Sequence, residues 1–246
     1  MRGGALVGAM LALAVFASPA SAARLQGIDV SRFDGPIDWE QVAGDGIRFA
    51  FVQASRGAGD DCAVKPQRCG RDGLYDANYE GARAAGVPVG AYHRAFVTGR
   101  GRATLRDDAQ AEAEVFIDRV GRLRPGDLRP ALDFETPFAD VKAEQLRLWV
   151  RVWLRRVTDA LGVKPVIYTN TSSWAATGDT TEFALDGNAL WVANWGVRKP
   201  AVPASDWGGE GWSVWQYTSD GSVDGIHGRV DRDVLHGGRL GSLTVR

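Results

Sequence analysis

The chain has 246 residues, of which 45% are hydrophobic and 24% charged, and its formal net charge is −1. This balance excludes a basic nucleic-acid-binding protein held by counterion release, and it excludes a disordered protein of high net charge. The length fits one large domain, since a single α/β barrel commonly has about 200–250 residues. No repeat, linker or break in composition divides the sequence, so we expect one domain.

Residues 1–22 have the order of a secretory signal peptide. Arg2 is the only charge, a run of small and apolar residues follows it, and the run leads to the small-x-small sequence Ala20-Ser21-Ala22. The apolar run is shorter than the roughly 20 residues that span a bilayer. We therefore expect cleavage after Ala22, a catalytic domain of residues 23–246, no stable membrane association and a periplasmic or extracellular location.

Short apolar runs alternate with helical patterns along the rest of the chain. Eight runs have the near-continuous apolar character of strands buried on both faces of a parallel sheet. They cover residues 25–31, 48–55, 87–94, 129–135, 164–170, 189–195, 212–218 and, more weakly, 228–234. Helices are expected over residues 38–43, 72–86, 104–121 and 140–161. No long helix is expected after about residue 186, so five βα units followed by three strands predict one barrel.

Two cysteines, Cys62 and Cys69, lie close together in the polar segment DDCAVKPQRCGRDG. In an oxidising compartment they can pair into a local disulfide. A zinc site would need further ligands, and the histidines His93, His227 and His236 are not at ligand spacing. We therefore expect a disulfide and no metal.

Polar or aromatic residues accompany every predicted strand, and sites of parallel α/β proteins form at the carboxyl ends of strands. These residues are Asp29, Gln53, Tyr92, His93, Asp133, Glu135, Tyr168, Asn170, Asn194, Trp195, Gln216 and Asp231. Asp29 and Asp231 belong to the first and last strands, which become neighbours when a barrel closes. Four carboxylates would then line one cleft. Aromatic side chains beside them suit the apolar faces of sugar rings.

The sequence Asp133-Phe134-Glu135 is the sharpest of these features. Residues i and i+2 of a strand point to the same face, with Cα atoms about 6.6 Å apart. Repulsion between two such carboxylates raises the pKa of one, which suits a general acid, while the other stays ionised. This pair is the minimum for glycoside hydrolysis. Taken alone, the same sequence also serves as a turn or a helix cap.

Other catalytic patterns are absent from the sequence. It has no G-x-S-x-G elbow, no P-loop and no G-x-G-x-x-G after the first strand. We therefore expect no nucleotide cofactor and no other cofactor.

In chain order, the segments of residues 25–237 resemble the glycoside hydrolase family 25 lysozymes, the Chalaropsis-type N-acetylmuramidases. The segments are GIDVSRFDGPIDWEQV, FAFVQASRG, AGVPVGAYH, PALDFE, PVIYTN, LWVANW and WSVWQYTSDGSVDGIHGRVDRDVL. The resemblance implies a single flattened TIM-like barrel, (β/α)5(β)3. It also implies cleavage of the β-1,4 bond between N-acetylmuramic acid and N-acetylglucosamine in peptidoglycan, without a metal.

The resemblance places the family's four acidic positions on Asp29, Asp133, Glu135 and Asp231. Glu135 matches the general acid. Asp133 matches the residue that supports the nucleophilic step, either directly or by orienting the substrate acetamide. Sugar-binding residues are then expected at Tyr92, His93, Tyr168, Asn170, Trp195 and Gln216. The expected partner is the peptidoglycan glycan strand, bound by a monomer.

Some positions depart from the family pattern. The second strand is often followed there by Lys-Ala-Thr-Glu-Gly, whereas this chain has Gln53-Ala54-Ser55-Arg56-Gly57, with Arg56 in place of the acid. Arg94 follows Tyr-His in place of a common aromatic residue, and the segment with the two cysteines resembles an insertion. Two alternative functions remain open: a catalytically silent peptidoglycan-binding module, and a hexosaminidase acting on chitin-type glycans.

Overall fold

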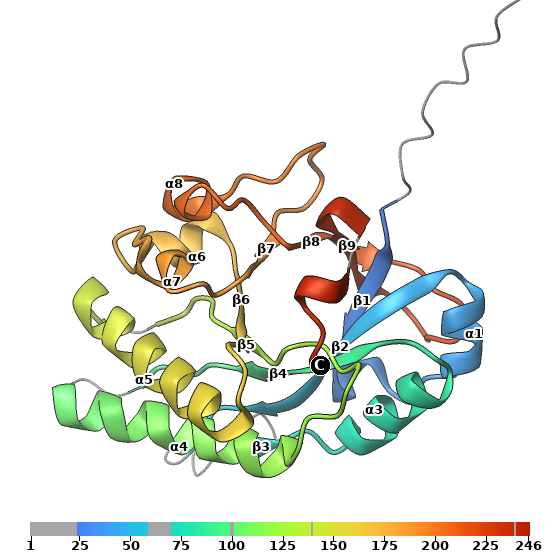
Figure 1. The fold of residues 1–246 in the computed structure, drawn as a ribbon, viewed down its shortest axis with the longest axis horizontal. Helices are drawn as coiled ribbons and strands as arrows, with labels where there is room; N and C mark the ends of the chain where they lie inside the picture. The colour runs from blue at the N-terminus through green and yellow to red at the C-terminus, as the bar shows by residue number, and fades with distance from the viewer. Residues whose placement is uncertain (1–23, 59–69, 99–100, 139, 239) are drawn as a thin grey trace, which may run out of the picture.

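A computed structural model describes residues 24–58, 70–98, 101–138, 140–238 and 240–246 (Figure 1). The expected signal peptide of residues 1–22 lies outside this described part, and so do Cys62 and Cys69. Cleavage after Ala22 and the disulfide therefore stay predictions. None of the helices in the described ranges is long and apolar enough to cross a membrane.

Eight strands close into a barrel, and a ninth short strand extends the sheet. The strands are β1 (Gln26–Val30), β2 (Ile47–Arg56), β3 (Gly70–Arg71), β4 (Val89–Arg94), β5 (Ala131–Asp133), β6 (Val166–Thr169), β7 (Leu190–Ala193), β8 (Val214–Gly221) and β9 (Val230–Leu235). Their order is β1-β9-β8-β7-β6-β5-β4-β2-β3, and pairing of β1 with β2 closes the barrel. Neighbouring barrel strands are parallel, except that β9 is antiparallel to both β1 and β8. All eight predicted strands and the predicted α/β barrel are confirmed.

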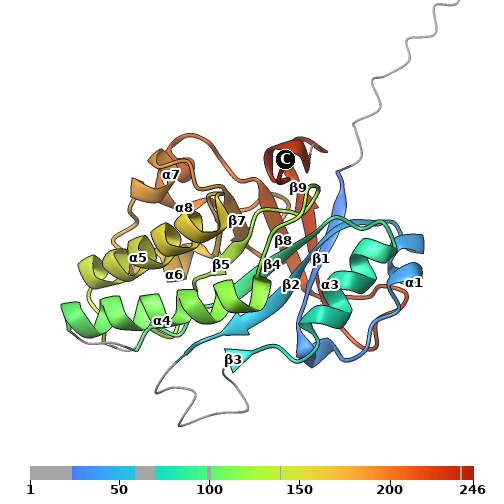
Figure 2. The same ribbon diagram turned by 60° about the horizontal axis from the view of Figure 1, so that its bottom comes forward.

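Helices surround the barrel on its outside (Figures 1 and 2). The four predicted helices correspond to α1 (Trp39–Gly44), α3 (Tyr75–Ala84), α4 (Arg102–Val120) and α5 (Ala143–Leu161). Three short helices were not predicted, namely α6 (Thr171–Ala175), α7 (Glu182–Leu185) and α8 (Pro203–Gly208). Helices α4 and α5 lie side by side on one flank, while α1 and α3 cover another (Figure 2). In α5 the apolar stripe is buried and Gly162, with φ 74°, ends the helix.

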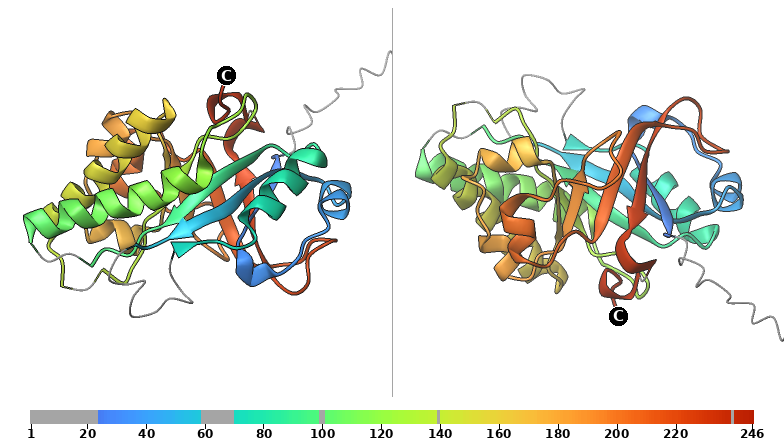
Figure 3. Two further views of the ribbon diagram at one scale, coloured as in Figure 1. Left: turned by 90° about the horizontal axis from the view of Figure 1, so that it is seen from below. Right: turned by 90° about the horizontal axis from the view of Figure 1, so that it is seen from above.

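Strand alternation divides the apolar side chains between two cores. Phe49, Phe51 and Trp191 point into the barrel, whereas Ile28 and Val52 belong to the core between strands and helices. Figure 3 shows the strands enclosed between the helices on either side. Because successive residues of a strand face opposite sides, each strand supplies both cores.

The C-terminal segment packs at the end of the barrel where the parallel strands begin. Leu243 is buried in the same cluster as Leu128 and Phe51, and Thr244 pairs with Leu128 through an isolated bridge. Two short 3-10 helices, His236–Gly238 and Leu240–Ser242, lead into this segment. The amino end of the barrel is therefore filled with side chains, which leaves the carboxyl end for a pocket.

Candidate active site

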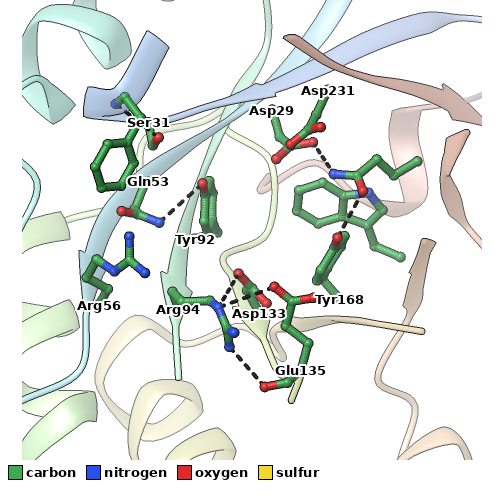
Figure 4. A pocket seen from close by; sticks show the side chains of 13 residues that line it. Asp29, Ser31, Gln53, Arg56, Tyr92, Arg94, Asp133, Glu135, Tyr168 and Asp231 are labelled. Atoms are coloured by element: carbon green, nitrogen blue, oxygen red, sulfur yellow. Dashed lines mark hydrogen bonds and ion pairs between the residues drawn. The ribbon is translucent and has the colours of Figure 1, made fainter. Parts of the chain in front are cut away.

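A pocket of about 220 Å³ lies among the carboxyl ends of the parallel strands (Figure 4). Most of its polar lining comes from interior-facing strand positions. The lining residues are Asp29, Ser31, Phe33, Gln53, Arg56, Tyr92, Arg94, Asp133, Glu135, Tyr168, Trp191, Gln216 and Asp231. Eight candidate residues from the sequence are in this set: Asp29, Gln53, Tyr92, Asp133, Glu135, Tyr168, Gln216 and Asp231.

Asp231 reaches the pocket in a different way from the one expected. The sequence analysis grouped it with residues at the carboxyl ends of strands, but it is the second residue of β9. Because β9 runs antiparallel to its neighbours, its amino end lies at the carboxyl ends of the other strands. Asp231 pairs in register with Asp29 of β1, so barrel closure brings these two carboxyl groups together.

A single arginine joins the two carboxyl groups of the D-x-E sequence. Arg94, the last residue of β4, places its Nε 3.4 Å from Asp133 Oδ2 and 3.3 Å from Glu135 Oε1. Its Nη1 also donates to the backbone oxygens of Glu135 and Ala95. The sequence analysis named Arg94 only as a departure from the family. Its position two residues after Tyr92 on one strand was the available signal that it faces the pocket.

Burial governs the protonation of these acids. Burial, opposed by Arg94 and reinforced by repulsion from Glu135, raises the pKa of Asp133 to about 8. Burial and repulsion by Asp34 and Glu135 raise the pKa of Asp231 to about 6. The predicted raised pKa of the D-x-E pair is thus found on Asp133, and its largest cause is burial rather than mutual repulsion.

A hydrogen-bond network fixes the opposite side of the pocket. Gln216 Nε2 donates to Asp29 Oδ2 at 2.7 Å. Gln216 Oε1 accepts from Tyr168 Oη at 2.9 Å and from Trp195 Nε1 at 3.0 Å. Burial, followed by repulsion from Asp231 and Asp233, raises the pKa of Asp29 well above its ordinary value. The amide of Gln216 therefore orients one acid and two aromatic side chains.

Asp233 is a fifth acid that the sequence analysis missed. It is fully buried beneath the pocket, and its Oδ1 accepts a hydrogen bond of 2.8 Å from Trp191 Nε1. Burial is the largest cause that raises its pKa to about 8. The sequence could have predicted this acid, because Asp233 lies two residues after Asp231 on one strand and both side chains therefore point to the same face.

His93 does not belong to the pocket, and this corrects its expected place among the sugar-binding residues. It follows Tyr92 on β4, so its side chain points outward to the helices. The ring is fully buried between Ser55 Oγ, 2.8 Å from Nδ1, and Glu112 Oε2, 2.7 Å from Nε2. Burial, together with the nearby Arg94 and Arg56 guanidinium groups, lowers the pKa of His93 to about 3. The ring connects β2, β4 and α4.

Asn170 and Trp195 line a second pocket of about 260 Å³, which shares Glu135 and Tyr168 with the first. Asn170 Oδ1 accepts the backbone N–H of Ser173 and so caps α6. The Trp195 side chain is exposed. The two pockets adjoin, and Glu135 and Tyr168 line both of them.

Arg56, which the sequence analysis named only as a departure from the family that the chain resembles, lines the wall of the first pocket. In Figure 4 it lies across the pocket from Asp29 and Asp231. The described residues include no group of three or more His, Cys, Asp or Glu side chains that could hold a metal ion.

Two carboxyl groups in a pocket that aromatic side chains also line can protonate a glycosidic oxygen and support the anomeric carbon. An α/β barrel with this arrangement at the carboxyl ends of its strands has the features of a glycoside hydrolase.

Comparison with known proteins gives the family. The profile of glycosyl hydrolases family 25 matches residues 28–226. Lysozyme M1 of Streptomyces globisporus is 33% identical over 239 residues, which cover 92% of this chain and 73% of that protein. The N,O-diacetylmuramidase of Chalaropsis sp is 26% identical over 223 residues, which cover 84% of this chain and 96% of that protein. The bacterial lysozyme from Streptomyces coelicolor superposes with a TM-score of 0.74 at 32% identity, over 88% of this chain and 94% of that one.

The chain therefore belongs to glycosyl hydrolases family 25. It is a glycoside hydrolase of the lysozyme type, and the family implies peptidoglycan as its substrate.

Proposed function

We propose that this enzyme is a secreted N-acetylmuramidase that cleaves the β-1,4 bond between N-acetylmuramic acid and N-acetylglucosamine, with Glu135 as the general acid. The observation that carries the proposal is the place of Glu135, at the junction of two adjoining pockets. A glycan strand that occupies both pockets would present one glycosidic oxygen to this side chain. Glu135 is also the more exposed acid of the pair, at 32% of its side chain against 12% for Asp133.

The first proposed step is proton transfer from the Glu135 carboxyl group to the glycosidic oxygen, which lets the leaving sugar depart as an alcohol. Positive charge then develops at the anomeric carbon in the first pocket. The pair shares one proton, and this step needs that proton on Glu135 although burial raises the pKa of Asp133 to about 8. As a carboxylate, Asp133 would support the charge either by direct attack or by orienting the substrate acetamide. In both cases water later completes the hydrolysis, with Glu135 accepting its proton.

The two acids lie close together, as a retaining outcome requires. Asp133 and Glu135 each have one oxygen within 3.4 Å of the same Arg94 nitrogen, so these two oxygens are at most about 7 Å apart. This bound includes the roughly 5–5.5 Å of retaining enzymes and excludes most of the roughly 6.5–9.5 Å that inverting enzymes leave for a water molecule. NMR of the anomeric proton of the first-formed product reads this outcome directly.

A digest of purified peptidoglycan tests the function. We expect the protein to release new muramic acid reducing ends, identified by borohydride reduction and mass spectrometry. Glu135→Gln, which keeps the size of the side chain but cannot donate the proton, should reduce the rate by a factor of about 10²–10⁴. Its melting temperature should stay close to that of the unchanged protein.

Three outcomes would contradict the proposal. New glucosamine ends would indicate a hexosaminidase of another specificity. Binding to the polymer without new ends would indicate a silent module. Full activity of Glu135→Gln would remove that residue from the role of acid. Secretion is tested separately, by N-terminal sequencing of the exported protein, which should begin at Ala23.

A further inference from the structure

Arg56 is a cation on the pocket wall that has no anionic or hydrogen-bonding partner in the described part of the chain. Its guanidinium makes no ion pair and no hydrogen bond with any described residue, and its Nε is buried without an acceptor. Arg94, by contrast, already contacts both Asp133 and Glu135. The hydrogen-bond donors of Arg56 are therefore left for something that enters the pocket.

Two aromatic rings hold the Arg56 side chain in place. Its guanidinium carbon lies 5.5 Å from the centre of the Phe33 ring and 5.0 Å from the centre of the Phe96 ring. The backbone N–H of Phe96 donates to the buried carboxylate of Glu112, at 3.1 Å from Oε2. This contact fixes the segment that carries Phe96, and the two rings restrict the Arg56 side chain. Arg56 therefore loses little side-chain entropy when it binds a ligand.

The surroundings of Arg56 favour an anionic ligand. Burial, together with the nearby Arg94 guanidinium, lowers the pKa of Arg56. A partly buried guanidinium without a counter-ion is unfavourable, and an anion that enters the pocket removes this penalty. The planar fork of an arginine matches a carboxylate through two parallel hydrogen bonds. Muramyl units of peptidoglycan carry carboxylates on the lactyl group or on the attached peptide, whereas chitin-type glycans carry none.

We propose that Arg56 forms an anion subsite that binds a carboxylate of the muramyl unit, and that it thereby selects muramyl glycans over neutral ones. This inference rests on the proposed function, because it takes the muramyl unit as the occupant of the first pocket. The Arg94 guanidinium, whose carbon lies 5.7 Å from the same Phe96 ring, adds positive potential to the subsite.

Binding without turnover tests the subsite. The ligand is the disaccharide-peptide of N-acetylglucosamine and N-acetylmuramic acid, titrated calorimetrically into the Glu135→Gln protein. Adding Arg56→Met should weaken binding about tenfold or more, as expected for a lost charge-assisted pair. The same ligand with its carboxyl groups amidated should bind both proteins alike. Arg155→Met, which removes an exposed arginine of α5, is the matched control and should leave both affinities unchanged.

Equal weakening of the charged and the amidated ligand, or no weakening with either the disaccharide-peptide or the peptide-free disaccharide, would overturn the subsite. In the disaccharide-peptide the lactyl carboxyl group forms the amide bond to the peptide, so dependence on Arg56 with this ligand assigns a peptide carboxylate. Dependence that appears only with the peptide-free disaccharide assigns the lactyl carboxylate, and both results support an anion subsite. Because no cleavage is needed, failure of the proposed muramidase activity would show in the digest and not in this titration.

Discussion

At the scale of single residues, Arg94 is the group that connects the two acids of the D-x-E sequence. Its Nε lies within 3.4 Å of both Asp133 and Glu135. A cation at that distance stabilises the ionised form of each carboxyl group. It therefore limits how far burial raises the pKa of Asp133.

Removal of this charge should move the pH dependence of the enzyme. In the proposed mechanism the two acids together hold one proton, and Arg94 favours its loss. In Arg94→Met the acids should retain protons to higher pH, so both limbs of the kcat/KM profile should shift upward by about one pH unit or more. Arg94→Lys, which keeps a charge, should shift the profile less. Profiles of the two variants that coincide with that of the unchanged enzyme would show that Arg94 does not set this protonation.

Some residues of the site could be predicted from the sequence, and others could not. Residues such as Asp133 and Gln216 were identified because polar side chains near strand ends are informative in α/β folds. Strict alternation would also have excluded His93 and found Asp233, because neighbours on a strand face opposite sides and second neighbours face the same side. The contact of Arg94 with both acids depends on the path of its side chain, which no strand pattern specifies.

At the scale of elements, the direction of β9 is what completes the acid cluster. Apolar runs predicted eight strands correctly, but a run gives no direction. Helices α6, α7 and α8 have four to six residues, too few for a periodic apolar stripe, and were missed for that reason. In α8 the residues Ala204–Trp207 have φ between 52° and 57°, a left-handed conformation that composition does not predict.

Close packing between strands gives a prediction at this scale. A Cβ atom on Gly90 of β4 would lie 2.8 Å from the Phe51 ring and 2.9 Å from Leu128 Cβ, inside the barrel. Gly90→Ala should therefore lower the free energy of unfolding by about 1–3 kcal/mol, measured by urea denaturation. Gly44→Ala is the control, because its added Cβ meets no atom within 4 Å. Equal stability of the two variants would mean that the barrel interior relaxes around the extra methyl group.

At the scale of the whole molecule, the site is built at the expense of stability. Four buried or partly buried aspartates, Asp29, Asp133, Asp231 and Asp233, have pKa values raised by burial. An acid whose pKa is higher in the folded state binds more protons there than in the unfolded chain between the two pKa values. The contribution of these groups to the free energy of unfolding is therefore fully present below about pH 4, near the pKa of an unfolded aspartate. It is lost as the pH rises through the pKa values of the folded protein, which are about 6 for Asp231 and about 8 for Asp233.

Asp233→Asn tests this relation, because Asp233 lies beneath the pocket and is outside its lining. The amide oxygen of an asparagine can still accept the Trp191 Nε1 hydrogen bond, while the group no longer ionises. At pH 8 the variant should be more stable than the unchanged protein by several kcal/mol, because each unit by which the pKa is raised corresponds to about 1.4 kcal/mol. At pH 4, where the native carboxyl group is protonated, the difference should vanish. Urea unfolding at both pH values measures this difference in the free energy of unfolding. An equal gain in stability at pH 4 and pH 8 would show that the substitution acts through packing and not through ionisation.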